Sequence, residues 1–257
     1  MFSFIRCYQD IIFPSEGGRQ EVLFAPEDYS AASGEVLVLT GLVSFFISMI
    51  WNREIFESNP LKDRLGYNNV CVTWDEPPAL YVAPIIFAPA IFLSVRYAVL
   101  DYIRAAVDPN LTKWRKNFVH ICNLLYVISV WIFPMIFVVP PTVSAVWHTI
   151  SFGQYIFFRY VMIVGNYVEV DVVSRASWIF LIIYGFISVG FLTVLYINYI
   201  NFDTKQGPTL PWALSMIFDY SWFVCLVLTE FLLPKQVPLK VTYEQSGSGG
   251  EEDPPVA

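Results

Sequence analysis

Ionisable side chains inside long apolar runs are the residues of this sequence best suited to chemistry, because hydrocarbon penalises an unpaired charge. Asp219 is the sharpest case, since it lies near the middle of the apolar run Leu210–Leu233. Ser215, Trp222 and Glu230 share its helix face by their spacing. The sequence therefore predicts a polar stripe here, with Asp219 and Ser215 as candidates for a ligand or ion pathway.

A second polar stripe is expected in the apolar run Val143–Val168. His148, Tyr155 and Arg159 recur there at spacings that place them on one face of a helix. Counted from the same membrane surface, His148 lies within about two helical turns of Asp219. We therefore expect a contact between His148 and Asp219, with Tyr155 lining the same pathway.

A charge cluster is expected at the opposite depth of the membrane. Arg96 and Arg159 lie near the level of Glu230, so these three side chains are expected to meet. Such a cluster can relay protons, hold a lipid headgroup or gate a pore. The alternative is that both arginines snorkel to the inner interface and that Asp219 is a neutral acid bonded to a tyrosine or serine.

A short basic segment, Lys113-Trp-Arg-Lys116, lies beside an apolar run. Juxtamembrane basic clusters attract anionic lipid headgroups, so Lys113, Arg115 and Lys116 are expected to contact anionic phospholipids. The alternative is that they only anchor the chain by the positive-inside rule.

Composition excludes several classes of function. Of the 257 residues, 56% are hydrophobic and 14% charged, and the net charge of -7 leaves no positive surplus for nucleic acid. Four cysteines and two histidines supply few ligands for metal or haem, and no lysine lies in the apolar runs to bind retinal. We expect no cofactor and no metal, and no catalytic motif indicates an enzyme.

Six apolar runs are long enough, or nearly so, to cross about 30 Å of hydrocarbon. They are Val36–Trp51, with an alternative upstream extension through Ala31, Pro78–Leu100, Phe118–Val139, Val143–Val168, Ala176–Ile200 and Leu210–Leu233. Backbone groups in hydrocarbon must be satisfied within their own segment, so these runs are helices. The predicted fold is an all-α, polytopic membrane protein with a six-helix transmembrane bundle. Pro140 and Pro141 should join the third and fourth helices in a tight hairpin, and Pro134 should kink the third.

The loops orient this bundle. One side collects nine basic residues: Arg6, Arg19, Arg104, Lys113, Arg115, Lys116, Arg175, Lys235 and Lys240. The other side collects four, which favours cytosolic termini in a plasma membrane or endomembrane.

Three regions follow from this layout. Residues 1–30 are expected to form an interfacial segment, with a helix at Met1–Phe13, and residues 31–234 the transmembrane domain. Residues 235–257 are expected to be a flexible tail whose end, Asp253–Ala257, is typical of a vector linker.

The layout resembles the DRAM/Sfk family, which includes autophagy modulators and lipid-remodelling factors that mature GPI anchors. The local cues are Trp74-Asp-Glu-Pro-Pro78, Asn123, His148-x-x-x-Phe152 and Glu230-Phe231. A lone Cys71 in the first loop departs from the several cysteines of some members. The resemblance implies a non-catalytic protein that organises lipids or partner proteins.

Three hypotheses for function therefore stand together. The first is a scaffold or lipid-related factor in the bilayer. The second is an ion channel or proton-coupled transporter that uses Asp219 and His148, with homo-oligomers allowed. The third is an accessory subunit of a larger membrane complex. A continuous polar cavity between the fourth and sixth helices would favour transport, and a closed aromatic core would favour the scaffold.

Overall fold

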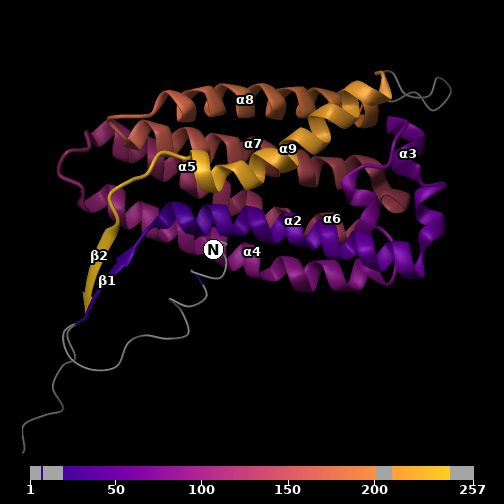
Figure 1. Ribbon diagram of the computed structural model, residues 1–257, viewed down its shortest axis with the longest axis horizontal. Helices are drawn as coiled ribbons and strands as arrows, with labels where there is room; N and C mark the ends of the chain where they lie inside the picture. The colour runs from indigo at the N-terminus through magenta and orange to yellow at the C-terminus, as the bar shows by residue number, and fades with distance from the viewer. Residues whose placement is uncertain (1–6, 8–19, 201–209, 244–257) are drawn as a thin grey trace, which may run out of the picture.

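A computed structural model describes residues 7, 20–200 and 210–243, and six long helices form a bundle along its longest axis (Figure 1). They are α2 (Pro26–Trp51), α4 (Ala79–Val107), α5 (Lys113–Ile132), α7 (Pro141–Glu169), α8 (Arg175–Leu195) and α9 (Trp212–Leu232). The predicted segments Met1–Phe13, apart from Cys7, and Ser246–Ala257 lie outside the described residues. The mostly helical fold agrees with the predicted all-α class, apart from the two-stranded sheet described below.

Five of these helices are long and apolar enough to cross a membrane: α2, α4, α5 with its extension to Val138, α8 with its extension to Asn198, and α9. The sixth long helix, α7, is not among them because it is more polar. Large apolar side chains on the bundle surface, such as Ile85, Ile182 and Phe186, are between 68% and 73% exposed. Exposed apolar area of this extent is typical of a lipid-facing surface. The chain is therefore a multi-pass membrane protein.

Proline and serine define several helix boundaries. Pro140 and Pro141 are the N-cap and first residue of α7, as predicted. Ser144 then leaves helical geometry, and its side chain accepts a hydrogen bond of 3.3 Å from the Trp147 backbone N–H. Pro134 lies between α5 and the short helix α6 (Met135–Val138), at the position where a kink was predicted.

Two predicted boundaries are wrong at the same end of the bundle. Helix α2 begins at Pro26 rather than Val36, and α4 continues to Val107 rather than ending at Leu100. Both extensions carry charged residues, which a hydropathy count treats as the end of a span. Here Glu27, Asp101 and Arg104 are buried against one another, so the helices continue through them.

A small antiparallel sheet projects from this end of the bundle, which we call the sheet end (Figure 1). It pairs β1 (Gln20–Phe24) with β2 (Leu239–Tyr243), with Gln20 opposite Tyr243. The strand β2 corrects the expectation that the whole of residues 235–257 is a flexible tail. The sheet joins the segment before α2 to the segment after α9.

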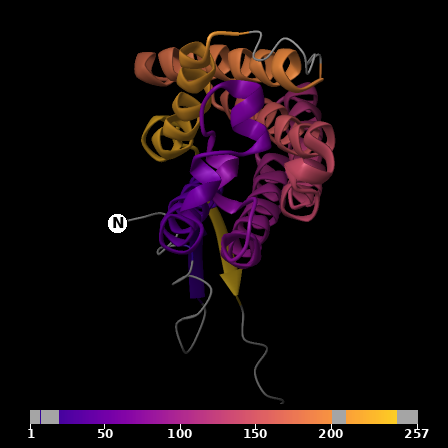
Figure 2. The same cartoon turned by 90° about the vertical axis from the view of Figure 1, so that its right-hand side faces the viewer.

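The opposite end, which we call the loop end, carries a compact loop between α2 and α4 (Figure 2). The loop contains η1 (Arg53–Phe56), α3 (Pro60–Leu65) and η2 (Val70–Trp74), and the segment η3 (Tyr196–Ile200) extends α8. Leu61, Leu65 and Trp74 are buried, so the loop packs onto the helices. Asn59 and Asn69 cap its short helices by accepting hydrogen bonds from backbone N–H groups.

Buried aromatic rings fill the bundle between its two ends. Phe133 stacks against Phe87 with ring centroids 4.7 Å apart, and against Phe152 at 5.8 Å. Phe152 contacts Trp222 at 5.5 Å, and Phe133 contacts Phe137 at 6.1 Å. We call these five rings the aromatic layer. They are all at least nine-tenths buried, so the layer packs the space across the bundle.

Candidate functional site

Four charged side chains meet inside the sheet end, and we call them the sheet-end cluster. The Arg104 guanidinium on α4 donates from Nε to Glu169 Oε1 at 3.2 Å and from Nη2 to Glu169 Oε2 at 3.0 Å. It also bonds Glu27 Oε2 at 3.3 Å and the Asp101 carboxylate one turn earlier. All four side chains are buried. One cation thus joins three acids from α2, α4 and α7.

Neutral groups complete the sheet-end cluster. Asn123 on α5 donates to Asp101 Oδ2 at 2.6 Å, and Tyr97 donates to the same atom at 3.4 Å. Gln236, in the segment after α9, donates from its side chain to Glu169 Oε2 at 3.1 Å and from its backbone N–H to Glu27 Oε1 at 3.4 Å. Each carboxylate oxygen of the cluster therefore has a donor within the protein.

Arg159 is fully buried in the middle of the bundle, which excludes the predicted snorkelling to an interface. Its Nη1 donates to the hydroxyls of Ser33, Tyr126 and Tyr155 at 3.0 to 3.3 Å, and its Nη2 to the Ser30 carbonyl at 3.1 Å. Gly34 leaves the room for this guanidinium, because a Cβ there would lie 2.8 Å from Nη2.

The predicted cluster of Arg96, Arg159 and Glu230 is wrong. The sequence predicts a similar membrane depth for these three side chains, but depth alone does not fix the direction in which each side chain points. Arg159 faces the hydroxyls described above, and the Arg96 guanidinium lies 5.4 Å and 5.2 Å from the ring centroids of Phe24 and Tyr29. These are cation–π distances. Glu230 is half-buried on α9 and forms no ion pair with either arginine.

Asp219 is fully buried near the loop end, on α9. The Tyr67 hydroxyl donates to Asp219 Oδ2 at 3.0 Å and lies 3.3 Å from the Ser215 carbonyl oxygen. Ser215 Oγ accepts from Asn198 at 3.4 Å. A tyrosine bond to this acid agrees with the alternative interpretation of Asp219. Its Oδ1 has no hydrogen-bond partner within the part of the chain that the structure describes.

His148 faces a different acid, so the predicted contact between His148 and Asp219 is wrong. His148 Nδ1 lies 3.0 Å from the Val139 carbonyl, which fixes the ring, and Nε2 lies 3.9 Å from Asp75 Oδ1. Both Nε2 and that carboxylate oxygen are buried and lack hydrogen-bond partners among the described residues. Tyr155, the remaining predicted pathway residue, is separated from His148 by Phe152 and bonds Arg159 instead.

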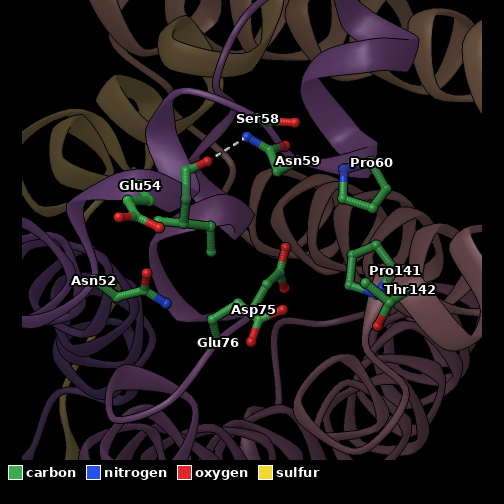
Figure 3. A pocket seen from close by; sticks show the side chains of 10 residues that line it. Asn52, Glu54, Ser58, Asn59, Pro60, Asp75, Glu76, Pro141 and Thr142 are labelled. Atoms are coloured by element: carbon green, nitrogen blue, oxygen red, sulfur yellow. Dashed lines mark hydrogen bonds between the residues drawn. The ribbon is translucent and has the colours of Figure 1, made fainter.

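Asp75 follows η2 directly and lines a cavity of about 390 Å³ at the loop end (Figure 3). In this view Asp75 and Glu76 lie in the centre, with Asn52 and Glu54 on one side and Thr142 on the other. Burial, and secondarily the charge of Glu76, raises the pKa of Asp75 well above its usual range. The cavity is therefore acidic, and its deepest carboxyl group is poorly solvated.

An apolar groove of about 580 Å³ lies between α2 and α9, beneath the loop. Its walls include Leu42 and Phe45 from α2 and Phe223 from α9, and Phe56 and Val70 cover its loop end. Leu42 is 54% exposed, so the groove opens onto the lipid-facing surface of the bundle.

The basic segment at the start of α5 is partly occupied by internal contacts. Arg115 donates to the Val168 carbonyl and to Asp171 Oδ1, both at 2.6 Å, and Lys116 donates to the Ala106 carbonyl at 2.9 Å. Lys113 is exposed. Contact of this segment with phospholipid headgroups stays a prediction.

In comparisons with known proteins, the chain matches no family model, no curated protein and no solved structure. Its function is therefore argued from the geometry above. Among the described residues, no group of three or more histidine, cysteine or acidic side chains is placed to hold a metal ion. Cys71 is a weak nucleophile, since burial and then the carboxyls of Asp75 and Asp219 raise the pKa of its thiol.

The sheet-end cluster and Asp75 were missed as site residues by sequence reasoning. A signal for the first exists, because Tyr97, Asp101 and Arg104 repeat at spacings of four and three and so share one helix face. Asp75 lies in the quoted Trp74-Asp-Glu-Pro-Pro78 segment, but no spacing rule connects that loop to His148.

Proposed function

We propose that this protein is a non-catalytic membrane protein that binds lipid, with an acyl chain held in the groove between α2 and α9. We further propose six transmembrane helices, with α7 as the sixth, and cytosolic termini at the sheet end. The proposed relationship to the DRAM/Sfk family, which includes lipid-related factors, rests on this layout.

The groove is the observation that carries the proposal. It is lined mainly by aliphatic and aromatic side chains and lies between two helices that are each apolar enough to cross a membrane. Lipid surrounds helices that cross a membrane, so an acyl chain is the group that lies beside the groove. Its volume of about 580 Å³ is within the range of small-molecule sites, about 300–1,000 Å³.

A transport function receives less support from the same structure. Transport by way of His148 and Asp219 needs a hydrated path along the polar face of α7. The aromatic layer lies between His148 and Arg159 on this face, and Phe152 itself belongs to the layer. An accessory-subunit role is compatible with lipid binding, and co-purification of a stoichiometric partner would favour it.

The groove can be tested by filling it. We expect Leu42→Trp to place an indole in the groove and to displace about two methylene groups of a bound chain. At about 0.8 kcal/mol per methylene, this weakens lipid binding about tenfold. Binding is measured by native mass spectrometry of protein purified in mild detergent, after titration with phosphatidylcholine.

Leu39→Trp is the matched control, because Leu39 is 45% exposed on the same helix but does not line the groove. Equal lipid binding by both variants, with both proteins folded, would remove the groove as the lipid site. Retention of lipid by Leu39→Trp and its loss from Leu42→Trp would support the proposal.

A further inference from the structure

A buried pair of polar atoms connects the loop between α2 and α4 to α7. His148 Nε2 and Asp75 Oδ1 face each other at 3.9 Å, and both atoms have almost no accessible surface. Neither atom forms a hydrogen bond within the part of the chain that the structure describes. Buried polar groups are almost always satisfied, so these two atoms are best understood as each other's partners.

The orientation of the His148 ring shows what the pair requires. Its Nδ1 lies 3.0 Å from the Val139 carbonyl oxygen, which can only accept, so Nδ1 carries a hydrogen. A neutral ring then turns the lone pair of Nε2 toward Asp75. An ionised carboxylate in this place would face that lone pair without a donor, which is costly for buried groups. One proton on either atom supplies the donor, and a small shift of the loop would bring the two atoms to hydrogen-bond distance.

The groups around the pair do not replace this proton. The ionisable groups that face Asp75 are Cys71, Glu54 and Glu76 from the loop and His148 from α7. Burial, and secondarily the charge of Glu76, raises the pKa of Asp75 well above its usual range. No lysine or arginine of the described residues lines the cavity beside it. Loss of the proton as pH rises therefore leaves a buried negative charge without a cation.

The segment that ends at Asp75 also forms one wall of the acyl-chain groove. Asp75 follows η2 directly, and Val70 and Thr73 of η2 line the groove. On the other side of η2, Ser48 Oγ of α2 donates to the Thr73 carbonyl at 2.8 Å. Thus η2 covers the loop end of the groove, while the residue after it faces α7. A shift of Asp75 moves a groove wall that is only two residues away.

We propose that a proton held between Asp75 and His148 keeps η2 docked, and that its loss at higher pH opens the loop end of the groove to phospholipid. This regulation rests on the proposed lipid function of the groove. An acid whose pKa is higher in the docked loop than in the released loop favours docking at low pH, and this preference is lost as pH rises through the higher pKa. A difference of about one in pKa changes the docking equilibrium about tenfold. Asp75 also lines the acidic cavity, which gives the proton a path to water.

The experiment follows η2 and lipid separately, on the purified protein in mild detergent from about pH 5 to about pH 10. Hydrogen–deuterium exchange, corrected for the intrinsic effect of pH on exchange, measures the protection of peptides that contain η2. Native mass spectrometry with deuterated phosphatidylcholine measures the rate of lipid entry. As pH rises, we expect the protection of η2 to fall and lipid entry to become faster, each by about tenfold.

Variants assign the response to this pair. Asp75→Asn cannot ionise, and its amide can donate to His148 Nε2 as the protonated acid does. We therefore expect it to keep η2 protected and lipid entry slow at every pH. Asp63→Asn is the matched control, since Asp63 lies in the same loop but is exposed and does not line the cavity, and it should keep the full pH response. His148→Gln serves where Asp75→Asn does not fold, because its amide can donate to an ionised Asp75 and should also remove the response.

The two proposals fail in different ways. Protection of η2 that does not depend on pH overturns the proton control and leaves lipid binding in the groove intact. A pH response that persists in both Asp75→Asn and His148→Gln does the same. No binding of phosphatidylcholine at any pH, with Leu42→Trp indistinguishable from Leu39→Trp, overturns the groove and with it the control of lipid entry.

Discussion

Arg104 is the residue whose loss should most weaken this fold. Its guanidinium bonds three buried carboxylates from three helices, so it holds α2, α4 and α7 together at the sheet end. Arg104→Gln removes the cation and leaves Glu27, Asp101 and Glu169 buried near one another. Breaking a buried ion pair from one side costs about 3–5 kcal/mol, because the remaining charge stays desolvated. We expect a loss of that size in the free energy of unfolding.

Arg115 provides the matched control at the same end of the bundle. Its ion pair with Asp171 is 2.6 Å long, and Asp171 is 72% exposed. Exposed ion pairs contribute about 0–1 kcal/mol, so Arg115→Gln should lose little more than its bond to the Val168 carbonyl. The two substitutions remove the same chemical group, one from three buried carboxylates and the other from a single exposed one.

The assay is reversible unfolding in mixed micelles with increasing denaturing detergent, supported by thermal unfolding. For a protein of this size about 1 kcal/mol shifts the midpoint by about 2–4 °C, so Arg104→Gln should lower it by about 6–20 °C. A combined variant that also carries Asp101→Asn and Glu169→Gln should recover part of this loss, because two of the three unpaired charges are gone. Equal losses in Arg104→Gln and Arg115→Gln would refute the reasoning.

Two further predictions concern the ends of the bundle. Asn110, in the exposed sequon Asn110-Leu-Thr112 between α4 and α5, should carry no glycan in eukaryotic cells, because the sheet end is proposed to be cytosolic. A mobility shift on glycosidase treatment would contradict this orientation, and Glu54→Thr, which creates a sequon at Asn52, is the positive control. Asp75, whose pKa is raised by burial, should add stability in acid that is lost as pH rises through that raised pKa. Asp75→Asn should therefore flatten the dependence of the free energy of unfolding on pH. The ionisable groups that face Asp75 are Glu54, Glu76, Cys71 and His148. Parallel pH curves for the variant and the unsubstituted protein would contradict a raised pKa at Asp75.

The helices could be predicted from the sequence because apolar length alone identifies a segment that lies in hydrocarbon. The proline-based boundaries at Pro134 and Pro141 follow as directly, since proline lacks the N–H that an internal helical bond needs. The ends of α2 and α4 could not be predicted in this way. Glu27 and Arg104 read as polar flanks in a hydropathy count, yet they neutralise one another inside the protein.

The pairing of polar side chains could not be predicted, for a geometric reason. Spacing assigns a residue to a helix face and an approximate depth, but not the rotation of that helix against its neighbours. His148 and Asp219 both lie toward the loop end, yet the loop between α2 and α4 supplies a separate partner to each. Asp75 faces His148, and Tyr67 binds Asp219. A folded loop of this kind leaves no periodic pattern in the sequence.

The two ends of the bundle differ in a way that locates function. In the sheet-end cluster each carboxylate oxygen accepts a hydrogen bond from a side chain or backbone group of the protein, and Gln236 Oε1 beside it has no partner among the described residues. At the loop end, Asp75 Oδ1, Asp219 Oδ1 and His148 Nε2 are buried without such partners among the described residues. Buried polar groups are otherwise almost always satisfied. Because the acidic cavity lies at this end and the apolar groove runs up to the loop that covers it, ligand binding is expected there, with the sheet end holding the helices in place.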